Sequence, residues 1–245
     1  MILALVGRGR MGSEVERLAR REGHTIRFTV DLPENANGAG LTPESLAGVE
    51  AVIDFSQPEA VMASIRRVAE ARVPMVVGTT GWYDALAEAR QLIAKHESAL
   101  VFGANFSIGA NLFLKIAEHA AHAFHPFPEY DPYVLEHHHH DKADAPSGTA
   151  LRLAELMLKH TDRKTRLQVG NPAGKIEPDA LQVASVRAGA AFGRHSLCFD
   201  SPTDTIELVH TARNREGFAR GALFAADWVR GKKGVYEFTE VLGVE

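Results

Sequence analysis

The segment that decides the fold is Met1-Ile2-Leu3-Ala4-Leu5-Val6-Gly7-Arg8-Gly9-Arg10-Met11-Gly12. Its first six residues form a short apolar run, which is typical of a strand buried on both faces. The glycines that follow are spaced Gly-x-Gly-x-x-Gly. Apolar residues then recur at helical spacing, at Met11, Val15, Leu18 and Ala19. The segment therefore predicts a strand, a tight glycine turn and a helix in direct succession.

An acidic residue extends this pattern to a cofactor. Asp31 closes the next predicted strand, at 25–30. In this context the glycines indicate a dinucleotide site, because they let the backbone approach a pyrophosphate at a helix N-terminus. Asp31 would accept hydrogen bonds from the ribose hydroxyls and repel a 2′-phosphate, which favours NADH over NADPH. A turn without any ligand is the alternative interpretation, and Arg8 and Arg10 could still reach a phosphate.

The first hundred residues continue as strand alternating with helix. Further strands are predicted at 51–55, 74–77 and 99–102, and helices at 59–71 and 84–96. This alternation predicts an α/β fold with a parallel sheet and right-handed crossovers. Ligands of such sheets bind in loops at the carboxyl ends of the strands. Two loops of this kind are candidates for the nicotinamide half of the cofactor, namely Gly78-Thr79-Thr80-Gly81 and Ala104-Asn105-Phe106-Ser107. Phe106 would either pack beside the ring or fill a hinge.

The pattern changes near Asn105. A helix is predicted at 108–124, a strand at 133–139 and a second helix at 147–160, followed by strands at 180–188, 195–200 and 205–210. We interpret this part as a helix-plus-meander domain. A helix at 217–230 is expected to return to the first domain. The prediction is a dinucleotide-binding domain made of 1–105 and 215–245, and a substrate domain made of 106–214, with hinges near Asn105 and Arg213.

The segment Glu136-His137-His138-His139-His140-Asp141-Lys142-Ala143-Asp144-Ala145-Pro146-Ser147-Gly148-Thr149 carries the chemistry. Histidine titrates near neutrality, lysine is a fixed cation, and Ser-Gly-Thr can open a helix whose first amides point outward. We therefore predict a carboxylate pocket with a general acid beside it. Along a strand, His138 and Lys142 would share a face and His139 would point the other way. Only alternate histidines could share one metal ion, so we predict no dedicated metal site.

Bulk properties exclude several classes of protein. The formal net charge is −4, which gives no reason to expect a nucleic acid or an anionic membrane as partner. Cys198 is the only cysteine, so no intrachain disulfide forms, and its apolar flanks predict a buried structural thiol. Neither a signal peptide nor a membrane-spanning run is apparent. A cytoplasmic enzyme is expected.

Taken together, these motifs resemble the dihydrodipicolinate reductase family of the diaminopimelate route to lysine. The resemblance rests on Gly-x-Gly-Arg-Met-Gly, Val-Ile-Asp-Phe-Ser at 52–56, Gly-Thr-Thr-Gly, Ala-Asn-Phe-Ser, the block from His138 to Thr149, and Val-Arg-Ala-Gly at 186–189. It implies a Rossmann-like domain, a second domain with a mixed sheet, and a homotetramer. The cofactor residues that it implies are Gly7, Arg8, Gly9, Arg10, Met11, Gly12, Asp31, Phe55, Gly78, Thr79, Thr80, Ala104, Asn105 and Phe106.

The resemblance also implies the reaction. The family's substrate, 4-hydroxy-tetrahydrodipicolinate, is a cyclic imine with two carboxylates. The 4-hydroxyl is lost as water, hydride from NADH or NADPH goes to C4, and a proton goes to C3. His138 matches the general acid and Lys142 its partner, which holds a carboxylate. His139, Ser147, Gly148 and Thr149 match the rest of the carboxylate cradle. Hydrogen bonding and charge at Lys142 suit that role, because they stabilise charge as the imine is reduced.

Three departures from the family pattern accompany the match. The glycine loop is one residue shorter than in many members, and Leu32 stands where the family often has an arginine that binds a 2′-phosphate. His140 and Asp141 fill variable positions, and Asp141 would either steady Lys142 or remain a solvated carboxylate. Two other functions stay open on the residues alone: another Rossmann-type oxidoreductase, and a non-catalytic protein that binds a metal or a nucleotide through the histidine run.

Overall fold

The computed structural model describes residues 1–243 and divides into two compact units. The first unit takes the described residues of 1–108 and 215–245, and residues 109–214 form the second. The chain crosses between the units twice, at Ile108–Gly109 and at Asn214–Arg215. Within the described part of the chain, no helix combines the length and apolarity needed to cross a membrane.

A six-stranded parallel sheet forms the centre of the first unit, in the order β11-β5-β4-β3-β1-β2. Its strands are β1 (Ile2–Val6), β2 (Thr25–Val30), β3 (Ala51–Asp54), β4 (Met75–Val77), β5 (Ala99–Phe102) and β11 (Gly234–Glu237). Its helices are α1 (Arg10–Arg21), α2 (Pro43–Leu46), α3 (Pro58–Glu70), α4 (Leu86–His96), α7 (Glu216–Trp228) and α8 (Phe238–Val241), with short 3-10 turns η1 (Ala36–Gly38) and η2 (Tyr83–Ala85). The predicted α/β class is confirmed.

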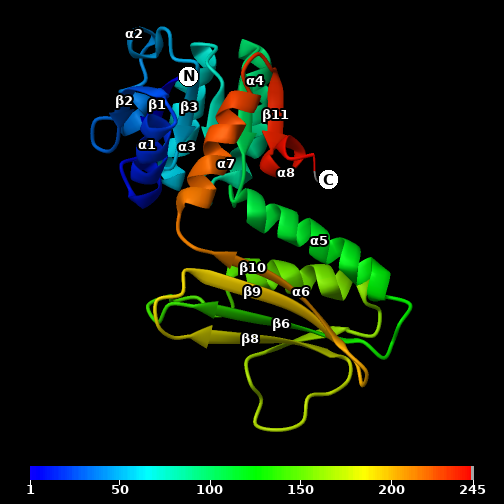
Figure 1. The fold of residues 1–245 in the computed structure, drawn as a ribbon. Helices are drawn as coiled ribbons and strands as arrows, with labels where there is room; N and C mark the ends of the chain where they lie inside the picture. The colour runs from blue at the N-terminus through cyan, green and yellow to red at the C-terminus, as the bar shows by residue number, and fades with distance from the viewer. Residues whose placement is uncertain (244–245) are drawn as a thin grey trace. The chain divides into compact units, whose positions relative to one another are not determined.

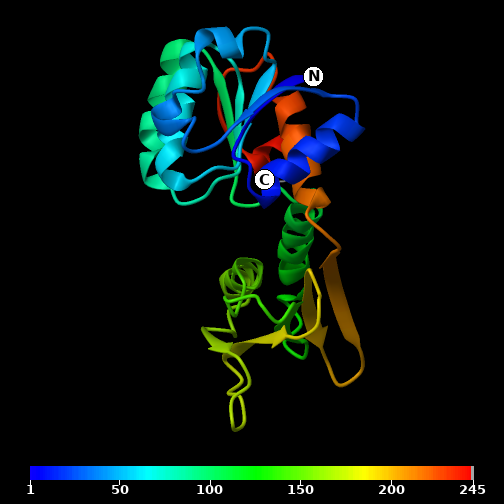
Figure 2. The ribbon, with the colours of Figure 1, turned by 90° about the vertical axis from the view of Figure 1, so that its left-hand side faces the viewer.

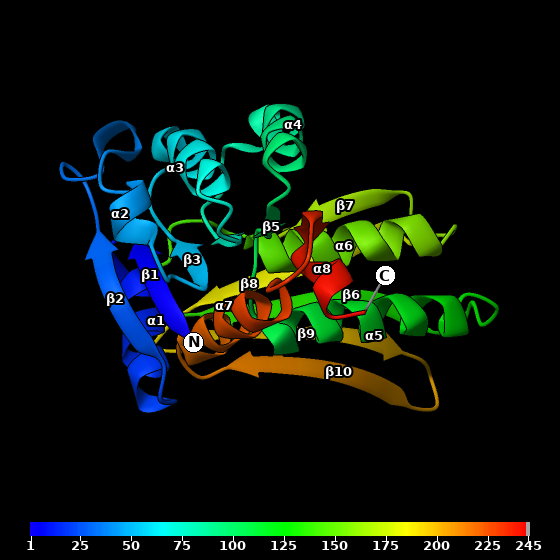
Figure 3. The ribbon, with the colours of Figure 1, turned by 90° about the horizontal axis from the view of Figure 1, so that it is seen from above.

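Helices cover both faces of this sheet. The alternation of side chains along β1 directs Leu3 and Leu5 to one core and Ala4 and Val6 to the other. Helices α1 and α7 pack on the first core, and α3 and α4 pack on the second, as Figures 2 and 3 show. Because every strand in the middle of the sheet is buried on both sides, its sequence is a continuous apolar run. That is why these strands could be predicted from short apolar segments.

The second unit is a five-stranded mixed sheet covered on one face by two helices (Figure 1). Its strands are β6 (Asp131–His138), β7 (Arg166–Val169), β8 (Ala180–Arg187), β9 (Gly193–Asp200) and β10 (Thr205–Ala212), and its helices are α5 (Ile108–Phe124) and α6 (Gly148–His160). The strand order is β10-β9-β6-β8-β7. Strand β6 runs parallel to β8 and antiparallel to β9.

The predicted meander is therefore wrong. A meander would pair β8 with β9, but β6 lies between them and pairs with both. The connection of β8 and β9 across β6 depends on non-local pairing, which local hydrophobic periodicity does not encode. Strands β7 and β11 were not predicted from the sequence, because neither has a continuous apolar run and none of their residues is buried.

Candidate active site

The site lies at the carboxyl end of β6, on the face of the sheet that α5 and α6 cover. Side-chain alternation directs Val134, Glu136 and His138 to this face. Val134 belongs to the apolar core, whereas Glu136 is fully buried and His138 is 6% exposed. The core face of the sheet thus changes from apolar to ionisable over the last residues of the strand. A buried carboxylate requires partners there.

Glu136 finds those partners on three other segments. Its Oε1 accepts hydrogen bonds from the backbone amide of Ser147 at 2.9 Å, from Ser185 Oγ at 2.7 Å and from Arg187 Nη2 at 2.7 Å. Register places Ser185 directly opposite Glu136 on β8. The carboxylate therefore joins β6, β8 and the start of α6 at one point.

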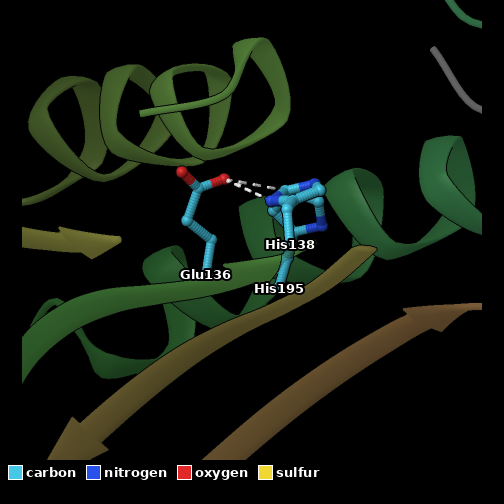
Figure 4. A group of neighbouring side chains, drawn as sticks. All are labelled: Glu136, His138 and His195. Atoms are coloured by element: carbon cyan, nitrogen blue, oxygen red, sulfur yellow. Dashed lines mark ion pairs between the residues drawn. The ribbon is translucent and has the colours of Figure 1, made fainter. Parts of the chain in front are cut away.

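The other oxygen of the same carboxylate faces two imidazoles. Oε2 lies 3.3 Å from His138 Nδ1 and 3.5 Å from His195 Nε2, and Figure 4 shows both rings gathered at this oxygen. His195 is opposite Glu136 on β9, and its Nε2 is also 3.0 Å from Ser147 Oγ. The three side chains come from neighbouring strands and share one face of the sheet.

Burial and charge set the protonation states of the pair. Burial lowers the pKa of His138 to about 4, and the charges of His195, Lys142 and Arg187 act in the same direction, against the carboxylate of Glu136. Burial on its own would raise the pKa of Glu136. The contact with His195 and the hydrogen bonds from Ser147 and Arg187 outweigh that effect and hold this pKa well below its usual range. At neutral pH the pair is an anion beside a neutral ring.

Strand β6 ends at His138, which corrects the strand argument for Lys142. After His138 the chain turns: the His139 amide donates to the carbonyl of Ala191 at 2.7 Å, and the Lys142 amide donates to the carbonyl of His139 at 3.2 Å. Lys142 is therefore in a loop and not on the predicted strand face. Its ammonium pairs with Asp144 at 2.6 Å. The charge of Lys142 nevertheless lowers the pKa of the His138 ring.

The acidic residue next to Lys142 in sequence has another partner. Asp141 is exposed and contacts His140 Nε2 at 3.1 Å, and His140 is exposed as well. The carboxylate beside the Lys142 ammonium is that of Asp144 and not that of Asp141.

Helix α6 begins with the predicted Ser-Gly-Thr turn. Ser147 is the N-cap, and its Oγ accepts from the Ala150 amide at 3.3 Å. Ser147 is buried, and its hydroxyl also bonds to His195, so the hydroxyl faces inward. Its role in binding a substrate carboxylate stays a prediction. Gly148 is exposed and Thr149 half-buried at the helix start. The first turn carries no acidic side chain of its own that would compete with a bound anion for these amides.

The glycine turn of the first unit has the geometry of a dinucleotide cradle. Gly7 has φ +98°, and a Cβ there would lie 2.4 Å from the carbonyl oxygen of Phe55. A Cβ on Gly12 would lie 2.0 Å from the carbonyl oxygen of Gly7. Gly9 caps α1 without a side-chain hydrogen bond and faces open space. This close backbone packing at an uncapped helix N-terminus fits a pyrophosphate.

Asp31 stands beside this turn and supports it. Its Oδ2 accepts from the Arg8 amide at 2.7 Å, and its Oδ1 accepts from the Leu32 amide at 2.8 Å. The Arg8 guanidinium lies along the end of β2, where it donates to the Thr29 carbonyl at 2.7 Å and contacts Glu34 at 3.5 Å. Arg10 and Met11 open α1.

A buried acid that the sequence analysis did not identify joins the next two loops. Asp54, at the end of β3, accepts from the Ser56 amide at 2.8 Å and from Thr79 Oγ at 3.1 Å. Burial raises the pKa of Asp54. The Thr79 hydroxyl thus donates to a buried carboxylate, whereas Thr80 is exposed. Contact of either residue with a cofactor stays a prediction. Gly78 is required because a Cβ would overlap the Phe55 ring at 2.0 Å.

The last predicted cofactor loop has one buried and one exposed part. Phe106 is 2% exposed and packs against Phe238 at 4.5 Å and Phe55 at 6.1 Å between ring centroids. Its ring therefore belongs to the core of the first unit, and the predicted contact of this ring with a nicotinamide stays a prediction. Ala104 is exposed, and Asn105 Oδ1 accepts from the Ser107 amide at 2.8 Å.

Sequence reasoning missed Glu136, Arg187 and His195 as site residues. A signal for Glu136 existed, because it occupies the core-facing phase of β6 between Val134 and His138. Arg187 belongs to the quoted Val-Arg-Ala-Gly, but that motif alone gives it no role. His195 could be recognised only from the pairing of β6 with β9.

Donor atoms of Glu136, His138 and His195 lie within 4.8 Å of one another and could in principle hold a metal ion. Arg187 already occupies the carboxylate at 2.7 Å, so a dication would stand beside a fixed cation. The contacts favour a hydrogen-bonded network over a metal centre. Cys198 is buried, as predicted, and burial raises the pKa of its thiol, which argues against a nucleophile.

Comparison with known proteins gives matches over both units. The model of "Dihydrodipicolinate reductase, N-terminus" matches residues 1–106, and that of "Dihydrodipicolinate reductase, C-terminus" matches residues 109–242. The 4-hydroxy-tetrahydrodipicolinate reductase of Christiangramia forsetii is 33% identical over 99% of this chain and 98% of its own length. That of Thiobacillus denitrificans is 35% identical over 97% and 96%. A dipicolinate-bound dihydrodipicolinate reductase from Paenisporosarcina sp. TG-14 superimposes with a TM-score of 0.78 at 25% identity, over 98% of each chain.

Proposed function

Because the chain belongs to the dihydrodipicolinate reductase family, we propose that it reduces 4-hydroxy-tetrahydrodipicolinate to tetrahydrodipicolinate with NADH or NADPH. This reaction is a step of the diaminopimelate route to lysine. The observation that carries the assignment is the buried Glu136–His138 pair beside Lys142 and the start of α6. The pair can handle a proton, and the two flanking groups attract anions.

A dicarboxylate suits the charge around the pair. Lys142 is half-buried, and the amides at Gly148 and Thr149 begin a helix without an acidic first turn. We propose that these three residues hold one substrate carboxylate, with His139 beside them. Lys142 exchanges Asp144 for the substrate in this scheme, because both are carboxylates and compete for one ammonium.

Protonation of the substrate falls to His138. The ring is neutral in the free protein, because burial lowers its pKa to about 4. Two substrate carboxylates bring negative charge close to the ring, and a neighbouring anion raises the pKa of a histidine. His138 can then take up a proton when the substrate binds and donate it toward C3. Lys142 offsets the charge of the ring carboxylate during this transfer.

The glycine turn would hold the cofactor, which supplies a hydride when bound. Gly7, Gly9 and Gly12 allow the pyrophosphate to approach the backbone. The proposal includes a preference for NADH, because Asp31 lies where a 2′-phosphate would be placed and Leu32 offers no cation. Arg8 contacts Glu34 and the Thr29 carbonyl, which occupies its guanidinium.

The proposed assembly is a homotetramer in the cytoplasm, where reduced nicotinamide cofactors are available. The face of the second sheet that α5 and α6 leave uncovered has exposed apolar side chains at Tyr133, Val186 and Val209, which are 37%, 41% and 44% exposed. A second copy of the chain is the proposed occupant of this face. Light scattering at several concentrations tests the assembly, and the variant Val209→Lys should shift it toward smaller species.

A coupled assay tests the activity. Pyruvate and aspartate semialdehyde are converted by a dihydrodipicolinate synthase, the protein is added with NADH or NADPH, and oxidation of the cofactor is followed. We expect oxidation that depends on the synthase. His138→Gln and Lys142→Ala should each reduce kcat by about 10²-fold or more, since each removes a group that acts in the transition state.

Matched controls use the same substitutions outside the site. His140→Gln alters an exposed member of the histidine run, and Lys175→Ala alters an exposed lysine. Both should retain the kcat of the unchanged protein. Wild-type turnover in His138→Gln would contradict the assignment of the acid. Failure to oxidise either cofactor, from folded protein that binds NADH, would favour another Rossmann-type oxidoreductase.

A further inference from the structure

We propose that Glu136 is a positioning residue for the reductase reaction: it holds His138 with the proton on Nδ1 and keeps Nε2 directed to the substrate. The inference rests on the proposed role of His138 as the acid. It is carried by the geometry of one carboxylate, whose Oε1 anchors the fold and whose Oε2 faces His138 and His195.

The two oxygens of Glu136 have different surroundings. Oε1 accepts three hydrogen bonds, from Ser147, Ser185 and Arg187. Oε2 is buried and makes no hydrogen bond among the described residues, and the same holds for His138 Nδ1, which it faces at 3.3 Å. The anchored oxygen fixes the carboxylate in place. The remaining oxygen therefore has unused capacity to accept a proton-bearing nitrogen.

The position of the ring follows from this contact. A buried nitrogen that faces a carboxylate carries the hydrogen, so the neutral ring of His138 has its proton on Nδ1. Its Nε2 lies on the opposite side, 3.1 Å from the position that a Cβ of Gly193 would occupy. When Nε2 takes up a proton, the ring becomes a cation beside Glu136. A charge-assisted hydrogen bond of about 2.7–2.9 Å is then favourable, so the 3.3 Å contact has room to shorten.

The surrounding charges make Glu136 necessary for this step. Lys142 follows β6, Arg187 is on β8, and His195 is on β9, and all three disfavour a proton on His138. Against these three groups, the carboxylate of Glu136 favours a proton on the ring. His195 also bonds to Ser147 Oγ, so the carboxylate, both rings and the start of α6 form a single unit. The proposed acid and the proposed carboxylate site are thereby held in a fixed position relative to each other.

The test compares Glu136→Gln with the matched control Glu118→Gln. Glutamine retains an oxygen for Ser147 and Arg187 but removes the charge. Glu118, on α5, makes a Glu–His contact of the same 3.3 Å length with His160, away from the site. Both variants and the unchanged protein are compared by the pH profile of kcat in the coupled assay and by ¹⁵N NMR of the His138 ring, assigned with His138→Gln.

Glu136→Gln should lower kcat by about tenfold or more, because a displaced acid transfers its proton poorly. Loss of the anion should also lower the pKa of His138, and the decline of kcat at high pH should move to lower pH. The NMR spectrum of Glu136→Gln should show loss of the Nδ1–H tautomer. The KM for substrate should change less than kcat, since the Lys142 and α6 groups remain. Glu118→Gln should match the unchanged protein in all three measurements.

A folded Glu136→Gln variant with unchanged kcat, pH profile and tautomer would overturn the proposal. If this variant does not fold, the NMR spectrum of the unchanged protein tests the proposal. An Nε2–H tautomer of its neutral His138 ring would overturn the proposal as well. The NMR measurement needs no turnover, so a protein without reductase activity but with an Nδ1–H tautomer would refute the proposed function and leave the Glu136 contact standing.

Discussion

Replacement of Gly193 by alanine tests how tightly the proposed acid is held. Gly193 begins β9 and has no positive φ, so alanine fits the backbone there. The added methyl group would lie 3.1 Å from Nε2 and 3.3 Å from Cδ2 of His138. The optimum for such contacts is about 3.5–4.0 Å, so the ring must move by about half an ångström.

The ring has little room to move away. Its Nδ1 side faces Glu136 at 3.3 Å, and the ring forms a T-shaped pair with that of His195, with centroids 5.0 Å apart. Overpacking of a close-packed site costs about 1–3 kcal/mol. Because a misplacement of about 1 Å can cost a reaction about 10²-fold, we expect kcat of Gly193→Ala to fall by about 10-fold or more. The methyl group also covers Nε2, the nitrogen proposed to carry the transferred proton.

Steady-state kinetics and thermal unfolding measure the two effects. Gly174→Ala is the control, because a Cβ at Gly174 meets no atom within 4 Å and the position lies in the same unit. The control should keep both kcat and the melting temperature. Gly193→Ala with wild-type kcat and melting temperature would refute the argument that His138 is held against Gly193.

Three further outcomes are expected. Burial places the pKa of His138 at about 4 in the free protein, and the dianion dipicolinate should raise this pKa. Because binding then takes up a proton, dipicolinate should bind more tightly, with a lower Kd, at about pH 6 than at about pH 7. A Kd independent of pH would count against this. Gly12→Ala places a methyl group 2.0 Å from the Gly7 carbonyl oxygen, so calorimetry should find NADH binding weakened by at least about tenfold, and unchanged affinity would exclude the cradle. Leu32→Arg adds a cation beside Asp31 at a position that is 47% exposed, and the ratio of kcat/KM for NADPH to that for NADH should rise by about tenfold, whereas a constant ratio would place the 2′-phosphate elsewhere.

Local patterns predicted the first unit well, because its strands are buried on both faces and its helices follow them directly. The segment from β1 through the turn at Gly7–Gly12 into α1 contains a buried strand and the helix that follows it in adjacent residues. In the second unit, the same reasoning identified most elements but arranged them incorrectly. Whether β6 pairs with β8 and β9 is decided by contacts between residues about 50 to 60 positions apart, such as Glu136 with Ser185 and His195.

In the candidate site, too, some residues could be predicted from the sequence and others depend on strand pairing. His138 and Lys142 could be selected from their residue types and their order in one segment. Glu136 is in that segment too, but its importance depends on Arg187 and His195, which arrive from other strands. The inward orientation of the Ser147 hydroxyl also depends on His195. Such partners are set by strand register, which a single sequence does not specify.

The late positions of helices α7 and α8 in the chain have a consequence for synthesis on the ribosome. The first unit needs Ala222 and Val229 from the α7 region and Phe238 from α8 to complete the core on one face of its sheet. These residues leave the ribosome after the whole second unit, 109–214, has been made. The nascent N-terminal segment therefore keeps one apolar face uncovered until the last residues of the chain have been made.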